Sequence, residues 1–323
     1  QLATLNNQVT GKITLFNNAQ DFSGTTKNLI DALTGIKGYE GDLNVNDTVA
    51  ITIKDIKALN ASTEGTLTLT GVNVLASTFT TDKAADILAA FKDVTAVMTG
   101  LITIKETITL AQAEDLSALT AGVVTATVAP AMATELLAAT FKGTDVLTVT
   151  VKGEYTAADL ILLNAETQFD KISLSNKAQA LTADVADVVT ALADTGYKGN
   201  VTVTGATAIT TADLIALNDL TTGKITLNAA SLANTATYSE TAANLVKAFN
   251  GITGLTGDVT ISSGAATITE LKAINKATTG AIAVTANQTL SGTAKDLVEA
   301  LKDVTLSADS TVEVIGPVTL AQI

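Results

Sequence analysis

Two stretches of the chain are near copies of each other. ITTADLIALNDLTTGKITLNAA runs from Ile209 to Ala230, and QLATLNNQVTGKITLFNNA opens the chain at Gln1, about 212 residues earlier. Both contain LN followed at a short distance by TGKITL. A chain that repeats itself in this way is built from copies of one structural unit, and it buries its core by stacking those copies.

The repeat is measured from the apolar residues that are equivalent to Leu214 in TTADLIALN. The spacings between them are 54, 60, 44, 54, 57 and 52 residues, a range that is typical of solenoids, propellers and arrays. We therefore expect one elongated solenoid of six two-coil repeats over residues 1–323, with units starting near residues 2, 56, 116, 160, 214 and 271. Because the two ends are in the same register, we also expect this to be a segment of a longer array. The markers are Leu2, Ile56, Leu116, Leu160, Leu214, Leu271 and Ile323.

Each unit is expected to contain two coils. The first has a short helix that ends in Asn, a Thr-Gly turn and a strand, as in ADLIALN, DLTTG and KITLN. The second has a helix capped by Ser239 or Thr241 and stopped by glycine, and then another strand. A strand that is always followed by a helix and another strand implies parallel pairing. The predicted fold class is an α/β repeat solenoid, with parallel strands on one side, short helices on the other, and about two coils per unit of 44–60 residues.

The second helix has its apolar residues at spacings that share one face. In SGTAKDLVEALKDV these residues are Leu297, Val298 and Leu301, which we expect to face the core. The third unit spans only 44 residues, from Leu116 to Leu160, so it has lost loop length and a helical turn. We expect the stack to bend or twist there.

The composition removes most catalytic chemistry. The chain has no His, Cys or Trp, and its 19 basic residues are all Lys. It therefore lacks the thiolate and imidazole ligands of transition metals, a Ser-His-Asp triad, a disulfide framework and the bidentate Arg contact with phosphate. The net charge of −13 argues against nucleic acid as a partner. We expect no enzyme; acid pairs acting on a polysaccharide are a distant third alternative.

A column of Asn residues is the first candidate site. It occurs at the end of the first helix of most units, with Thr120 at this place in the third unit. These side chains could hold a metal or a sugar, but we favour a structural ladder in which each amide holds its own turn and that of the next coil. The Asn residues are Asn6, Asn60, Asn164, Asn218 and Asn275.

The central residues of the expected strands form the second candidate site. Their apolar neighbours must face the helices, so these small hydroxyls should form an exposed ladder with a rung spacing of about 4.8 Å. Such a face could bind ice, carbohydrate or mineral, or could be covered by another chain. The alternative is that Thr is merely a favourable polar residue on an open strand. The candidates are Thr14, Thr68, Thr103, Thr125, Thr148, Ser173, Thr202, Thr226 and Thr260; Asn44, Ala283 and Glu313 interrupt the pattern.

No cofactor is expected. Calcium could bind among the surface carboxylates, but neither the EF-hand loop nor the calcium nonapeptide occurs. The glycine-rich segment 251–257 has no nucleotide-binding ending. Residues 118–141 are long enough to cross a bilayer, but they contain Pro130, Glu135 and many Thr and Ala residues. A strand followed by a helix is the better interpretation of that segment, so we expect no membrane span.

The alternation of TxADLxALNxxTTGxIT with LSGTAxDLVxAL resembles a repeat of very long bacterial surface proteins, including secreted cyanobacterial and proteobacterial adhesin-like and S-layer-like proteins. The resemblance covers Leu2 to Ile323 and is strongest in Ile209–Leu301. It implies an extracellular stalk, coat or filament; in some of these proteins calcium-binding modules lie elsewhere in the chain.

Together these features predict a structural protein at the cell surface. It would form a filament, sheath or layer from copies of itself, with a cell-surface polysaccharide as a further partner. The alternative is an adhesin stalk, or a solenoid that binds ice or carbohydrate through the Thr ladder.

Overall fold

The structure is a computed structural model that describes residues 1–81, 83–205, 209–228, 237–253 and 255–317. The terminal repeat marker Ile323 and its neighbour Gln322 lie outside the described residues.

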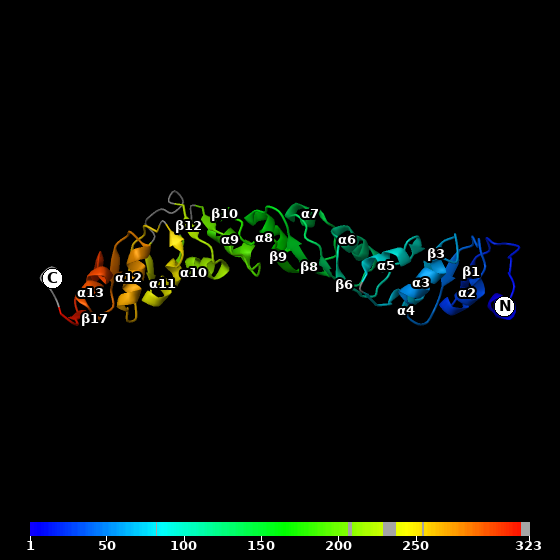
Figure 1. The fold of residues 1–323 in the computed structure, drawn as a ribbon, viewed down its shortest axis with the longest axis horizontal. Coiled ribbons are helices and arrows are strands. Elements are labelled where there is room, and N and C mark those ends of the chain that lie inside the picture. Colours follow the sequence, from blue (N-terminus) through cyan, green and yellow to red (C-terminus); the bar gives the residue numbers. More distant parts are fainter. Residues whose placement is uncertain (82, 206–208, 229–236, 254, 318–323) are drawn as a thin grey trace. The chain divides into compact units, whose positions relative to one another are not determined.

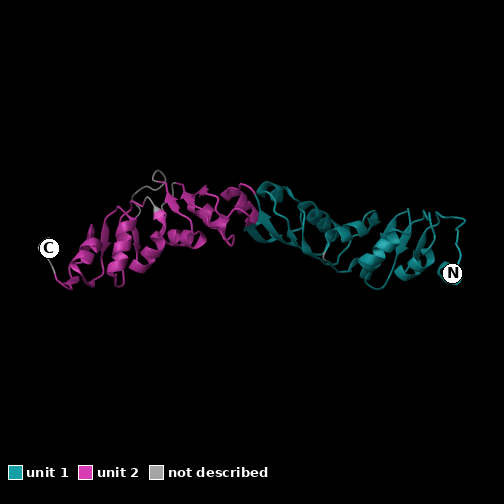
Figure 2. Ribbon diagram, viewed as in Figure 1, with its two compact units in different colours: residues 1–152, 165–173 teal, residues 153–164, 174–323 magenta. Residues whose placement is uncertain are grey.

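The chain divides into two compact units, which Figure 2 shows in different colours. Unit 1 contains residues 1–152 and 165–173, and unit 2 contains residues 153–164 and 174–323. The prediction of six two-coil repeats concerns a finer division, and it stays a prediction.

Unit 1 consists of short helices and short strands. Its helices are α1 (Leu2–Gln8), α2 (Thr26–Leu33), α3 (Ile53–Asn60), α4 (Val72–Leu75), α5 (Ala84–Ala90), α6 (Leu110–Leu119) and α7 (Ala133–Ala138). Its strands are β1 (Phe22–Gly24), β2 (Leu43–Val45), β3 (Leu67–Leu69), β4 (Phe79–Thr81), β5 (Val94–Thr95), β6 (Ile102–Ile108), β7 (Val124–Val128), β8 (Val146–Val151) and β9 (Phe169–Leu174).

Unit 2 has the same kinds of element. Its helices are α8 (Ala157–Ala165), α9 (Val185–Leu192), α10 (Thr211–Leu220), α11 (Ala242–Phe249), α12 (Ile268–Ala277) and α13 (Ala294–Ala300). Its strands are β10 (Leu181–Ala183), β11 (Val201–Val203), β12 (Ile225–Leu227), β13 (Tyr238–Glu240), β14 (Ile252–Thr253), β15 (Val259–Ile261), β16 (Ile282–Val284), β17 (Thr289–Gly292), β18 (Val304–Leu306) and β19 (Thr311–Val314).

The strands form small parallel sheets. Their orders are β1-β2-β3-β5 and β4-β6-β7-β8-β9 in unit 1, and β10-β11-β12-β14, β13-β15-β16-β18 and β17-β19 in unit 2. Neighbours within a sheet are in chain order, with helices in the connections, as parallel pairing requires; in six cases, such as β3 and β5, a strand of another sheet also lies between them in the chain. The helices of each unit also follow one another in chain order (Figure 1). The prediction of a mixed α/β chain with parallel strands is confirmed.

The helices α3, α6, α8, α10 and α12 begin with reciprocal caps, which explains many of the Thr and acidic residues, whereas α1 has no side-chain cap. Thr210 Oγ1 accepts a hydrogen bond from Asp213 N, and the Asp213 carboxylate accepts one from Thr210 N at 2.8 Å. Such a capping box satisfies backbone donors that have no partner inside the helix. The same pairs are Thr52 with Asp55, Thr109 with Gln112, Thr156 with Asp159 and Thr267 with Glu270.

The helices α2, α9, α11 and α13 are also capped by a side chain, and these four helices and α5 end at a left-handed residue. Thr241 Oγ1 accepts from Asn244 N at 3.3 Å, so Thr241 rather than Ser239 is the cap. The expectation of a glycine stop is wrong for three of these helices, where an aspartate has the positive φ. Aspartate tolerates this conformation better than most residues do. The left-handed residues are Gly35, Asp93, Asp194, Gly251 and Asp303.

The apolar core lies between the helices and the strands. Leu214 and the flanking strand residues Val201 and Ile225 are fully buried. In α13, Leu297 and Ala300 are buried, but Val298 is 60% exposed, so its expected place in the core is wrong. The buried positions of α13 are spaced by three residues, which places Val298 on the opposite side of the helix.

The structure shifts the register of the third repeat by three residues. Counted from the capping Thr109, Leu116 is equivalent to Leu217, seven residues after Thr210, and not to Leu214. The residue equivalent to Leu214 is Ala113, which is too small to be recognised as an apolar marker. The next helix, α7, has six residues, fewer than the seven or eight of its counterparts, and the bend expected there stays a prediction.

Successive turns of the chain approach each other closely at a recurring Thr-x-Gly sequence. Thr221 Oγ1 donates to Gly199 O at 2.6 Å and accepts from Gly223 N at 2.9 Å. A Cβ atom on Gly223 would overlap Gly199 O, so only glycine fits there. The same arrangement holds for Thr63 and Gly65 on Gly41, Thr120 and Gly122 on Gly100, and Thr278 and Gly280 on Gly257.

We predict that Gly223→Ala lowers the free energy of unfolding by about 1–3 kcal/mol, because the new methyl group forces two turns apart. Gly11→Ala is the matched control, since Gly11 is the equivalent glycine and a Cβ there meets only Val9 Cγ1 at 4.0 Å. Urea unfolding followed by circular dichroism measures both. Equal stability of Gly223→Ala and the parent would contradict the close approach.

Candidate functional surfaces

The predicted Thr and Ser residues lie inside strands, with one exception. In β12, Thr226 is half-buried between the buried Ile225 and Leu227. Thr14 is exposed and belongs to no strand. The other candidates are also half-buried strand residues: Thr68, Thr103, Thr125, Thr148, Ser173, Thr202 and Thr260.

Pairing between strands places these residues in separate rows and not in one ladder, and the sheet β4-β6-β7-β8-β9 has a second row, Thr107-Thr127-Thr148. In unit 2, Thr182, Thr202 and Thr226 are successive partners, and no member of the row is charged. Ser23, Thr80, Thr182, Ser239 and Thr305 belong to rows but are not among the sequence candidates. The other rows are Ser23-Asn44-Thr68-Thr95, Thr80-Thr103-Thr125 and Ser239-Thr260-Ala283-Thr305.

One row is interrupted by a change of register. Thr125 is the partner of Val146, whereas Thr148 is the partner of Thr127. The pairing of β6 with β7 also shifts between Thr103 and Thr107. Thr125 and Thr148 are therefore not neighbours in one row, because an irregular strand changes which residues are opposite each other.

Each Asn of the predicted column donates hydrogen bonds to backbone carbonyls at or just after the end of a later helix, which is the next one in the chain except for Asn60, where α4 intervenes before α5. Asn218 Nδ2 donates to Ala248 O at 2.7 Å, in the last turn of α11. Backbone carbonyls at a helix end lack partners within the helix, and a side-chain amide supplies one. The other pairs are Asn6 with Asp31 O and Thr34 O, Asn60 with Lys92 O, Asn164 with Thr190 O and Ala191 O, and Asn275 with Lys302 O.

Thr120 does not belong to this column. It is part of the Thr-x-Gly contact, and the position eight residues after the capping Thr109 is occupied by Ser117. The hydroxyl of Ser117 is too short to reach a helix end as Asn does. It donates instead to Asp145 Oδ2 at 2.5 Å.

Ser117, Lys142 and Asp145 form a buried polar cluster in unit 1. The Asp145 side chain is fully buried; its Oδ1 accepts from Val124 N at 2.9 Å and lies 3.4 Å from Lys142 Nζ. At the equivalent place in unit 2, Ile225 N donates to the backbone oxygen of Gly251. The carboxylate thus replaces a backbone acceptor where the second coil is shorter. The sequence carries no clear signal of this cluster, because the substitution of Ser for Asn is hidden by the register shift.

Ion pairs link helices that follow one another. Lys57 Nζ lies 2.6 Å from Asp86 Oδ1, and Lys247 Nζ lies 3.0 Å from Asp219 Oδ2. Lys272 contacts Asp296 at 2.6 Å and Glu299 at 2.8 Å. Hydrogen bonds with Asp296 and Glu299 raise the pKa of Lys272, and its ammonium group lowers the pKa of both acids.

The acids do not gather into a metal site in the described part of the chain: no group of three or more suitable ligands occurs there. Within the same residues, no helix has the length and apolar character needed to cross a membrane.

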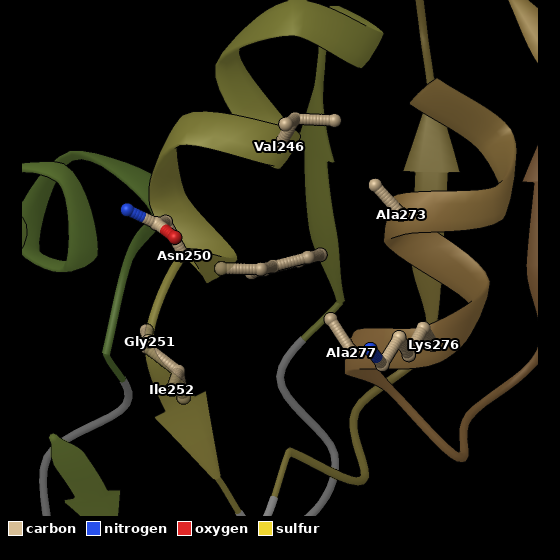
Figure 3. Close-up of a pocket in the computed structure, with 8 residues that line it drawn as sticks. Val246, Asn250, Gly251, Ile252, Ala273, Lys276 and Ala277 are labelled. Atoms are coloured by element: carbon tan, nitrogen blue, oxygen red, sulfur yellow. The ribbon is translucent and has the colours of Figure 1, made fainter. Parts of the chain in front are cut away.

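A hollow of about 310 Å³ lies beside α11 and α12 in unit 2 (Figure 3). Val246 and Ala273 face it from the two helices (Figure 3). Phe249, which is only 4% exposed, also lines it. We call it the Phe249 hollow; it is lined by Val246, Phe249, Asn250, Gly251, Ile252, Ala273, Lys276 and Ala277.

No protein-family model matches the chain, and no curated protein is significantly similar to it.

We predict that Asn218→Asp lowers the free energy of unfolding by about 1–2 kcal/mol, because it removes a donor and places a negative charge beside helix carbonyls. Asn17→Asp makes the same charge change at an exposed residue whose Oδ1 only accepts, from Ala19 N, so it should change little. Thermal unfolding by circular dichroism measures both variants. If they melt alike, the amide contact contributes nothing.

We predict that the stabilising effect of Lys272 depends on pH. The folded-state pKa values of Asp296 and Glu299 are lowered, so their contribution is present above the ordinary carboxyl range and is lost as the pH falls through the lowered values. The difference in melting temperature between the parent and Lys272→Gln should be largest near neutral pH in low salt, and should vanish in acid. A difference that stays constant down to about pH 2 would contradict this assignment.

Proposed function

We propose that this chain is a structural repeat protein of the cell exterior, which assembles with copies of itself into a filament, sheath or layer. In this proposal the two units are parts of one α/β solenoid, with strands on one side and helices on the other. The six repeats predicted from the sequence are its building blocks.

The recurrence of the same contacts from one turn to the next is the observation that carries this proposal. Thr221 on Gly199, Asn218 on the end of α11, and Lys247 on Asp219 each join one turn to a neighbouring turn. Equivalents of these contacts recur in both units. A protein whose neighbouring turns are joined in this way gains stability with each added turn, as load-bearing repeat proteins do.

The use of polar side chains supports a structural role over an enzymatic one. Asp213 and Glu270 cap their own helices, Asp219 and Asp296 form ion pairs, and the buried Asp145 is held by Ser117 and backbone donors. Acids that satisfy the protein's own backbone and lysines are poorly placed to act on a substrate. The proposal therefore includes no catalytic activity and no required cofactor.

The uncharged rows of the sheets favour a second candidate function. The row Thr182-Thr202-Thr226 presents hydroxyls at the spacing of parallel strands, on a protein of net charge −13. Hydroxyl rows free of like charge suit an uncharged ligand such as carbohydrate or ice. In this alternative the chain is an adhesin stalk or a ligand-binding solenoid.

The resemblance of the repeats to those of secreted bacterial surface proteins supports an extracellular location. It also supports cell-surface polysaccharide as a partner. Calcium enters the proposal only through that resemblance.

The test is negative-stain electron microscopy of the protein, with and without a calcium chelator, combined with sedimentation at high concentration. We predict ordered filaments or a lattice, and collapse on chelation would add calcium to the assembly. Monomers at all concentrations would overturn self-assembly. Glycan-array binding or thermal hysteresis by such monomers would then support the second candidate.

A further inference from the structure

We infer that Phe16 of one copy docks in the Phe249 hollow of a second copy and joins the copies head to tail. This inference rests on the self-assembly proposed above, and it names the contact.

Phe16 is the only exposed aromatic side chain of the protein. The chain has seven Phe and four Tyr residues, all of which lie in the described part, and the other ten are buried or half-buried. Phe16 is fully exposed, at 109% of its reference area. A lone exposed apolar residue is ordinary, and Val, Leu, Met and Ile side chains are exposed elsewhere, each between 38% and 82%. Phe16 exceeds them in exposed fraction, and its aromatic ring offers a partner more area.

The position of Phe16 in the repeat faces outward. The sequence TGKITLF aligns Phe16 with Asn228 in TGKITLN, and the residue after the strand is Thr70 or Thr285 in other repeats. Asn228, Thr70 and Thr285 are all polar and exposed. The repeat thus places a polar residue where this copy has an aromatic one, so the ring is exposed by its position and not by a local distortion.

The Phe249 hollow results from a small residue at the end of α12. The last helical residue, ten after the capping Thr267, is Ala277, whereas α6 and α10 have Leu119 and Leu220 at that place. Ala277 leaves unfilled the space beside Phe249 that a leucine side chain would enter. The lining from Val246, Ile252 and Ala273 is apolar, and about 310 Å³ is room enough for a phenyl ring.

Charge favours the same pairing. Lys276 lines the hollow and has no ion-pair partner among the residues that the structure describes, whereas Lys247 and Lys272 on the two adjoining helices each have one. The segment after Phe16, NNAQD, carries a single charge, that of the exposed Asp21. Copies of net charge −13 repel each other, so a contact that brings a cation to an acid reduces that repulsion.

Because Phe16 and the hollow are different surfaces of one chain, the contact is heterologous. Each bound copy still offers a free Phe16 or a free hollow, so the assembly grows until it closes into a ring or continues as a filament.

Sedimentation velocity over a concentration series tests the inference with Phe16→Asn and Ala277→Leu. Both variants introduce the residue found at the equivalent position of another repeat, so the fold should tolerate them, and their melting temperatures check this. Each variant alone should need at least about tenfold more protein to associate. An equimolar mixture should form dimers and stop, because the Phe16→Asn chain supplies only a hollow and the Ala277→Leu chain only a phenyl ring.

Val298→Thr, a change at another exposed apolar residue, is the control and should assemble like the parent. If Ala277→Leu does not fold, Lys276→Glu replaces it and should weaken association by reversing the charge. The inference would be overturned if Phe16→Asn assembled like the parent or if the mixture formed no dimer. It would also be overturned if the sedimentation coefficient of the parent did not depend on concentration. If the parent itself never associates, the proposed self-assembly is wrong as well. If the parent associates and the variants associate equally well, self-assembly stands and this contact is wrong.

Discussion

The close approach of successive turns at Gly223, Gly280 and their equivalents is the constraint on which the rest of the structure depends. Parallel strands fix the distance between turns at about 4.8 Å, so any corner where the backbone crosses between turns has no room for a side chain. Glycine gives that room, and the Thr two residues earlier uses its hydroxyl to join the two backbones. Once the corners are stacked, the Asn amides, helix ion pairs and apolar stripes of neighbouring turns meet in the same way each time.

The sequence was sufficient to predict the parallel α/β arrangement and the positions of the Asn column, because both follow from periodicity and chain order. It was not sufficient to predict the role of Thr221, since a Thr in a TTG turn has the same local pattern whether or not its hydroxyl spans two turns. The third repeat was placed three residues out of register, because Ala113 replaces the apolar marker and Leu116 imitates it. The division of the Thr residues into separate rows depends on strand pairing, which a single sequence does not specify.

The polar residues explain why the proposed role is structural. Most of the acids and amides described above are engaged with the backbone of their own helix or with the backbone or lysines of the next turn. The remaining surfaces include uncharged hydroxyl rows, shallow hollows and a single exposed ring. Such surfaces suit contact with another chain or an uncharged polymer better than chemistry on a substrate. The same repetition that stabilises the chain also makes an exception visible, since the aromatic Phe16 stands out only against the polar residues at the equivalent position of other repeats.

If the repeated contacts stabilise the chain, each turn is held mainly by its nearest neighbours. Hydrogen exchange with mass spectrometry on the intact chain carrying Gly280→Ala tests it most directly. We predict faster exchange in the sheet β13-β15-β16-β18, where Gly280 approaches Gly257, and unchanged exchange in the sheet β1-β2-β3-β5. A uniform increase in exchange across both units would mean that the chain unfolds as one cooperative body, and would contradict the account.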